Sequence, residues 1–89
     1  MNTETYLNHP TFGLLYKVCP IDEQQELYTT LYAQRLFFCV KSSAERFSFE
    51  PVSRSDARLL VETRLRKIRR LGTPEEYEQL HLIHQRTFQ

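Results

Sequence analysis

The hydrophobic pattern of this chain changes its period near residue 52, and this change constrains the fold more than any other feature. Before it, apolar side chains alternate with polar ones in short runs, the pattern of half-buried strands. After it, apolar residues recur at every third or fourth position, as they do on one face of a helix. The sequence therefore predicts a β domain over residues 1–52 and a helical hairpin over residues 53–89.

The first part contains short runs rich in aromatic and β-branched residues. Turn signals such as His9-Pro10 and Cys19-Pro20 separate them, and Pro51 ends the last one. Several short strands at close spacing favour a small five-stranded antiparallel barrel of the Tudor or SH3 type, in an α+β chain. The expected strands are Tyr6-Leu7, 11–18, 27–33, 36–41 and 46–50.

The second part has clear helix boundaries. Ser53 is placed to cap a first helix, with Asp56 at its third position, and Gly72 ends that helix. Thr73-Pro74-Glu75-Glu76 then combines an N-cap threonine, a proline at the first helical position and a glutamate at the third. The short connection at Gly72 predicts that the two helices pair antiparallel.

The sequence offers little to support chemistry. Its two glycines, Gly13 and Gly72, cannot form a phosphate-binding loop, and no serine or cysteine lies in an activating motif. His81 and His84 lie three residues apart, but no further ligands complete a metal site, and His9 beside Pro10 is typical of a turn. We therefore expect no enzyme activity, metal, cofactor or small-molecule ligand.

The cellular setting follows from similar arguments. No run approaches the roughly 20 apolar residues of a membrane span, and the start of the chain lacks the pattern of a signal peptide. Cys19 and Cys39 are expected to be buried thiols, because they are too few and too far apart for a redox motif or a disulfide framework. A cytoplasmic protein is the expectation.

The β part has more apolar residues than one small barrel needs. Phe12, Leu14 and Tyr16 would lie on one face of their strand while Leu15 lies on the other, and the later strands repeat this. Exposed aromatic surface of this kind is typical of a partner-binding site. The alternative is that the helical hairpin covers this face.

Charge is also distributed unevenly. The net charge is only +1, yet residues 54–71 hold seven basic side chains against two acidic ones. This helix could contact an acidic partner, or nucleic-acid phosphates as an alternative function. A steep loss of affinity with salt, flattened by charge reversal at Arg66 and Arg69, would indicate nucleic-acid binding. The cluster that would make this contact is Arg64, Arg66, Lys67, Arg69 and Arg70.

Specific strings carry a resemblance to a known family. YLNHPTFGLLY at residues 6–16 and LYAQRLFF at residues 31–38 resemble the cyanobacterial PII-interacting protein X (PipX) family, as do ARLLV at 57–61 and RLR at 64–66. The resemblance implies a Tudor-like domain followed by two helices. It also implies a regulatory adaptor in nitrogen control, without enzyme activity and monomeric when free.

The same resemblance implies the partners. Members of the family bind the T-loops of the signalling protein PII when it carries ADP and 2-oxoglutarate is low. At high 2-oxoglutarate they are released to the transcription factor NtcA, which they co-activate. Their helices can rearrange and offer surface to a GntR-type regulator. Direct contact with nucleic acid or membrane is not expected. The shared interface falls on Tyr6, Phe12, Leu14, Tyr16, Tyr32, Gln34, Arg35 and Phe38, with Glu4 at the rim.

Overall fold

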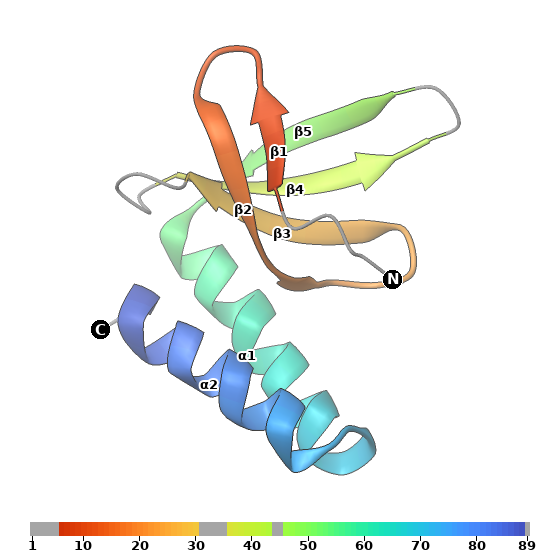
Figure 1. Cartoon of the computed structure of the whole chain (residues 1–89), viewed down its shortest axis with the longest axis vertical. Coiled ribbons are helices and arrows are strands. Elements are labelled where there is room, and N and C mark those ends of the chain that lie inside the picture. The colour runs from red at the N-terminus through yellow and green to blue at the C-terminus, as the bar shows by residue number, and fades with distance from the viewer. Residues whose placement is uncertain (1–5, 31–35, 44–45, 89) are drawn as a thin grey trace.

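The computed structural model describes residues 6–30, 36–43 and 46–88 of the chain. Five strands are followed by two helices, which confirms the predicted α+β class (Figure 1). Neither described helix has the length and apolar character that crossing a membrane requires. The elements are β1 (Tyr6–His9), β2 (Gly13–Pro20), β3 (Gln25–Thr30), β4 (Phe37–Ser42), β5 (Phe47–Val52), α1 (Arg54–Leu71) and α2 (Pro74–Phe88).

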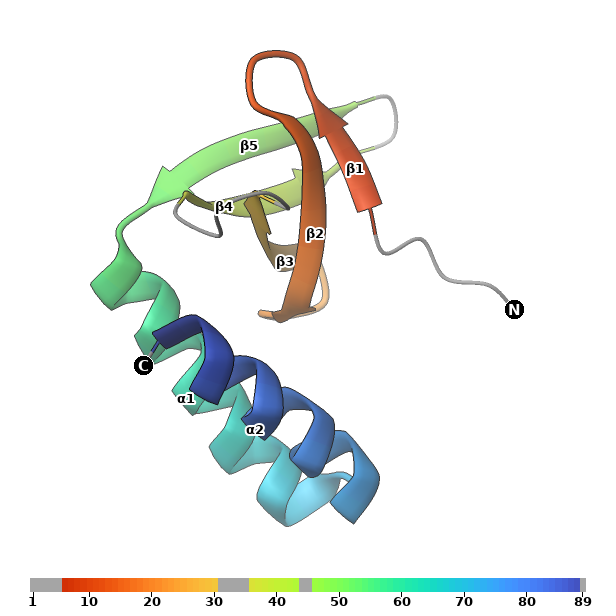
Figure 2. The same cartoon turned by 60° about the vertical axis from the view of Figure 1, so that its left-hand side comes forward.

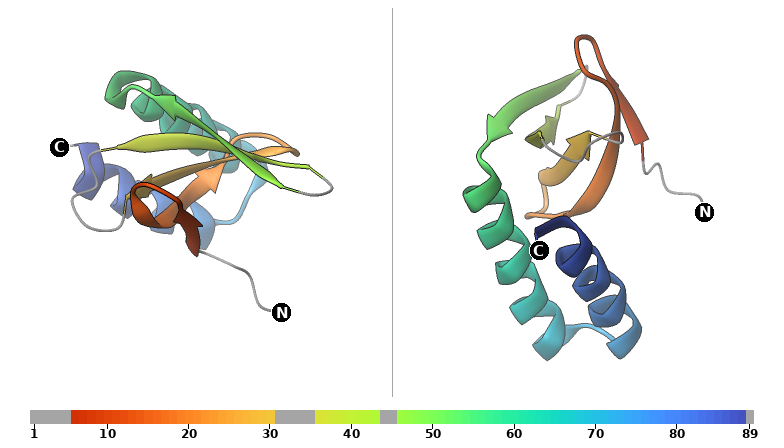
Figure 3. Two further views of the ribbon diagram at one scale, coloured as in Figure 1. Left: turned by 90° about the horizontal axis from the view of Figure 1, so that it is seen from above. Right: turned by 90° about the vertical axis from the view of Figure 1, so that its left-hand side faces the viewer.

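The strands form one antiparallel sheet in sequence order, from β1 at one end to β5 at the other. The sheet curls into a half-barrel, and the two helices lie together beyond one end of it (Figures 1 and 2). The turn between β1 and β2 lies at the opposite end of the sheet from the helices (Figure 1 and the right panel of Figure 3). The two ends of the molecule are therefore available for different contacts.

Each strand differs from its prediction at one or both ends, and Pro51, which was expected to end the last strand, lies within β5. The second strand begins at Gly13 rather than at residue 11, because Pro10, Thr11 and Phe12 form the turn that joins it to β1. Gly13 has φ +78°, in the left-handed region that favours glycine, so it fixes where the turn ends. The third strand runs over Gln25–Thr30 instead of 27–33, and the last residues of that prediction lie outside the described ones.

The apolar side chains form two clusters. One fills the inner face of the curled sheet and consists of Leu15, Tyr28, Phe38 and Val40, with Leu7 and Phe49 packed against it. The other lies where the sheet meets the hairpin and draws on both parts of the chain. It consists of Val18, Cys19, Leu27, Phe37, Ala57, Val61, Leu65, Leu80 and Phe88.

The predicted helix ends are confirmed by their capping contacts. The hydroxyl of Ser53 accepts a hydrogen bond from the amide of Asp56 at 3.0 Å. The amide of Glu76 donates to Thr73 Oγ1 at 3.2 Å, and the Glu76 carboxylate accepts from the amide of Thr73 at 3.0 Å. These bonds satisfy amide groups that a helix leaves without internal partners, so both helices begin where the sequence predicts.

The end of α2 is held against both α1 and the sheet. Arg54 Nη2 donates to the carbonyl oxygen of Thr87 at 2.8 Å, and its guanidinium lies 5.5 Å from the centre of the Phe88 ring. Phe88 in turn stacks on Phe37 of β4, with 5.4 Å between the ring centres. These contacts join the first turn of α1, the last turn of α2 and the start of β4.

A carboxylate joins the two helices near the middle of the hairpin. Glu62 Oε2 lies 3.0 Å from His84 Nε2 on α2 and accepts a hydrogen bond from Arg58 Nε at 3.0 Å on its own helix. These bonds, the one with His84 first, hold the pKa of Glu62 below its usual range. The ionised carboxylate is therefore the form that stabilises the hairpin.

This gives the hairpin a predictable response to acid. Because the pKa of Glu62 is lower in the folded chain than in the unfolded chain, its stabilising effect is complete above the ordinary glutamate value of about 4.3. The effect should disappear as the pH falls through the lower folded value. We expect urea denaturation to show a difference in stability between wild type and Glu62→Gln that is present at about pH 5 and shrinks as the pH falls further.

Glu78→Gln is the matched control, since Glu78 is an exposed glutamate on α2 that makes no ion pair within the described part of the chain. Its difference from wild type should not follow the same profile. A Glu62→Gln difference that stays the same across the acid range would contradict the assignment.

Candidate partner-binding surface

The β1–β2 hairpin presents tyrosines on its outer face. Tyr6 and Tyr16 are direct cross-strand partners, and their rings lie 5.8 Å apart at 50°. Asn8 and Leu14 are the next pair on the same face, because side chains alternate along each strand. Tyr6 is 46% exposed, while Leu14 and Tyr16 are partly buried. The sequence prediction grouped these three apolar residues, and the structure places them together.

Phe12 lies at the turn of the same hairpin and is 47% exposed. Its ring centre is 5.7 Å from that of Phe38 and 5.0 Å from that of His9. Phe38 itself is only 4% exposed and belongs to the inner cluster of the sheet. Phe12 is therefore the exposed ring of this pair, and the buried ring of Phe38 packs against it.

The remaining residues predicted for the interface are Glu4, Tyr32, Gln34 and Arg35. They lie outside the described residues. Their roles stay predictions that derive from the family resemblance.

Of the two explanations that the sequence offered for the apolar excess of the β part, the structure favours cover by the helical hairpin. The prediction assumed a single interior, so that side chains on the second face had to be exposed or covered by the hairpin. In the structure the inner face of the sheet is filled by its own cluster, and the hairpin covers Leu27 and Phe37 on the other. Among the described residues most of this excess is buried, and the exposed aromatic residues there are Tyr6, Phe12 and Phe47.

The residue that sequence reasoning undervalued is His9. Its Nδ1 accepts hydrogen bonds from the amides of Thr11 at 3.0 Å and Phe12 at 3.2 Å. Its ring contacts those of Phe12, Phe38 and Phe49 at 4.8 to 5.1 Å between centres. His9 is the last residue of β1 and not a residue of the turn itself, but its side chain closes the turn that Pro10, Thr11 and Phe12 form. Pro10 beside it signalled the turn, and nothing in the sequence signalled the acceptor role.

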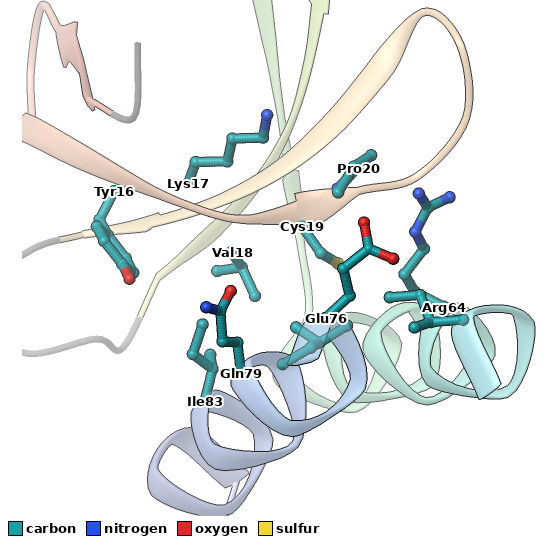
Figure 4. A pocket seen from close by; sticks show the side chains of 11 residues that line it. Tyr16, Lys17, Val18, Cys19, Pro20, Arg64, Glu76, Gln79 and Ile83 are labelled. Atoms are coloured by element: carbon teal, nitrogen blue, oxygen red, sulfur yellow. The ribbon is translucent and has the colours of Figure 1, made fainter. Parts of the chain in front are cut away.

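A groove of about 340 Å³ runs between β2 and the helical hairpin (Figure 4). Its lining is partly apolar, from residues such as Val18, Leu80 and Ile83. Tyr16, on the outer face of the β1–β2 hairpin, also lines it. Arg64 also lines it, and the Nε of that side chain is buried without a hydrogen-bond partner among the described residues. The groove therefore adjoins the outer face of the β1–β2 hairpin and extends from it toward the helices.

The two cysteines are held in their protonated form. Burial raises the pKa of Cys19 to about 12, although Arg64 and Lys17 act in the opposite direction, so its thiol stays protonated. Burial also raises the pKa of Cys39. Both cysteines are free. Within the described ranges, no group of three or more potential ligands could hold a metal ion.

The basic cluster of α1 divides between two directions. Arg64 faces the groove, whereas Arg66, Lys67, Arg69 and Arg70 are exposed. Arg66 donates to Thr63 Oγ1 at 3.3 Å, and none of the five basic groups forms an ion pair within the described residues. The last turns of α1 thus carry a concentrated, unneutralised positive charge.

Comparison with protein-family models identifies a family for this chain. The family model described as PipX, PII-interacting protein X, matches residues 3–88, which is nearly the whole chain. No curated protein matches the chain at a significant level.

Proposed function

This chain belongs to the PII-interacting protein X family, and we propose that it regulates nitrogen-dependent transcription by alternating between two protein partners. The first is the signalling protein PII, and the second is the transcription factor NtcA, which the chain would co-activate. The family match over residues 3–88 is the observation that carries the proposal.

The geometry of the β1–β2 hairpin supports it. Large aromatic side chains supply contact area with few rotatable bonds, which is why they dominate the energetics of protein interfaces. Tyr6 and Phe12 offer such side chains on one small hairpin, held by partly buried neighbours. The T-loop of PII would bind this surface, with Tyr32, Gln34 and Arg35 contributing as the family resemblance implies.

The switch would be competition for overlapping surface. PII carrying ADP would hold the chain when 2-oxoglutarate is low. ATP and 2-oxoglutarate would change the T-loops and release the chain to NtcA. In this scheme the effector acts on the partners, and the chain supplies only the surface for which they compete.

Calorimetric titration of the chain into its cognate PII tests this directly. We expect binding in the presence of ADP and much weaker binding with ATP plus 2-oxoglutarate. Tyr32→Ala should lower the affinity in ADP by a factor that corresponds to more than about 1 kcal/mol, as expected of a central aromatic contact. The same variant should bind NtcA more weakly by a similar amount.

Each part of the result has a separate meaning. Equal binding in both nucleotide states would refute the proposed switch but keep PII as a partner. Unchanged affinity of Tyr32→Ala for either partner would remove Tyr32 from the shared site. No binding to PII in either state would refute the adaptor function and favour the nucleic-acid alternative, in which the exposed basic residues of α1 would make salt-dependent contacts.

A further inference from the structure

We propose that His9 is a positioning residue for the partner-binding surface, and that it makes partner binding sensitive to pH. The neutral imidazole holds the turn that presents Phe12, and the protonated ring cannot hold it. This inference rests on the proposed function for its effect on PII, but its structural half concerns the free chain alone.

The first step is the hydrogen-bond geometry of the turn. Nδ1 of His9 accepts from the amide of Thr11 at 3.0 Å and from the amide of Phe12 at 3.2 Å. A ring nitrogen accepts hydrogen bonds only when it carries no proton, so this arrangement requires the lone pair of Nδ1. The side chain replaces the backbone carbonyl that would otherwise close a turn here, much as aspartate and asparagine do in other turns.

The second step is the packing of the ring. His9 lies against Phe12 of the turn, Phe38 of β4 and Phe49 of β5, with ring centres 5.0, 5.1 and 4.8 Å away. These neighbours do not titrate, and within the described residues no charged side chain forms an ion pair or hydrogen bond with the ring. A proton on Nδ1 would therefore meet two amide donors and no acceptor.

The third step links the turn to the surface. Phe12 follows Pro10 and Thr11 and precedes Gly13, whose φ of +78° ends the turn. The backbone of Phe12 is fixed on one side by Gly13 and on the other by the two bonds to His9. Loss of those bonds on protonation would release the exposed ring of Phe12 from the orientation in which Phe38 supports it. The turn lies at the end of the sheet away from the helices, so the fold as a whole would persist (Figure 3, right).

Two substitutions separate the hydrogen bonds from the ring. His9→Asn places a side-chain oxygen where it can accept from amides two and three residues ahead, without a group that titrates. His9→Leu keeps an apolar side chain and accepts nothing. His81→Asn, at the partly buried histidine of α2 that stacks on Tyr77, is the matched control.

The first readout is the affinity for ADP-bound PII across about pH 8 to 5.5, the interval in which histidines change charge. We expect wild type and His81→Asn to lose affinity more steeply on acidification than His9→Asn does. The extra loss should be roughly tenfold, the scale of two lost hydrogen bonds. His9→Leu should bind weakly at every pH. Groups on PII that titrate change the affinity of every variant alike, so the difference in pH dependence between variants reports on His9.

The second readout uses the free chain and needs no partner. Hydrogen exchange of the Thr11 and Phe12 amides should show protection in wild type that falls on acidification, after correction for the intrinsic rate. The protection should be independent of pH in His9→Asn and absent in His9→Leu. Failure of all variants to bind PII would refute the proposed function, and this readout would then decide the inference alone. Equal pH profiles for wild type and His9→Asn in exchange would overturn it.

Discussion

Replacing Phe37 with alanine is expected to lower the free energy of unfolding by about 3 to 5 kcal/mol. Phe37 is 1% exposed and lies in the cluster where the sheet meets the hairpin, stacked on Phe88. Truncation removes its contacts on both sides and leaves a cavity that neighbouring strands and helices cannot fill without moving. Urea denaturation followed by circular dichroism at neutral pH would measure the loss. Small domains have only about 5 to 15 kcal/mol in total, so much of the stability would disappear.

Phe47→Ala is the matched control for this experiment. Phe47 is also a phenylalanine on a neighbouring strand, but it is 50% exposed and belongs to neither cluster. We expect its truncation to cost less than about 1 kcal/mol. Similar losses for the two variants would mean that the hairpin does not pack on the sheet as described.

The helices could be predicted from the sequence to within a residue, because their boundaries depend on local chemistry. Ser53, Gly72 and the Thr73-Pro74 pair each act on amides or carbonyls within four residues of themselves. Such contacts need no knowledge of the rest of the chain. The strands were harder. Phe12 alternates in phase with Leu14 and Tyr16, so periodicity alone assigned it to a strand, whereas in the structure it belongs to the turn.

The candidate surface was predictable only in part, for a related reason. Apolar residues on both faces of β3 and β4 indicate either two buried faces or one exposed face, and the choice depends on how the hairpin packs. The pattern placed Phe12 and Phe38 alike in the apolar excess, and the family resemblance placed both in the interface, but Phe12 is exposed whereas Phe38 is buried. The acceptor role of His9 depends on two distances across a turn, which no pattern in the sequence specifies.

Replacing Phe12 with alanine is expected to weaken binding to ADP-bound PII by roughly 30-fold, the effect of losing one interface residue that contributes about 2 kcal/mol. Phe12 is about half exposed in the free chain, so a partner that covers it removes a large apolar area from water. Its ring is also held by Phe38 and His9, so little conformational freedom is lost on binding. Calorimetric titration at neutral pH would give the change directly.

The control for this prediction is again Phe47→Ala, because Phe47 and Phe12 have the same side chain and nearly the same exposure. Hydrophobic area alone would make the two substitutions equivalent, so a loss confined to Phe12→Ala would require a contact at the β1–β2 turn. Equal losses would instead indicate a diffuse apolar interaction with no defined centre. An unchanged affinity for Phe12→Ala would separate Phe12 from the interface. Any pH dependence at His9 would then be a property of the turn in the free chain, without a consequence for binding.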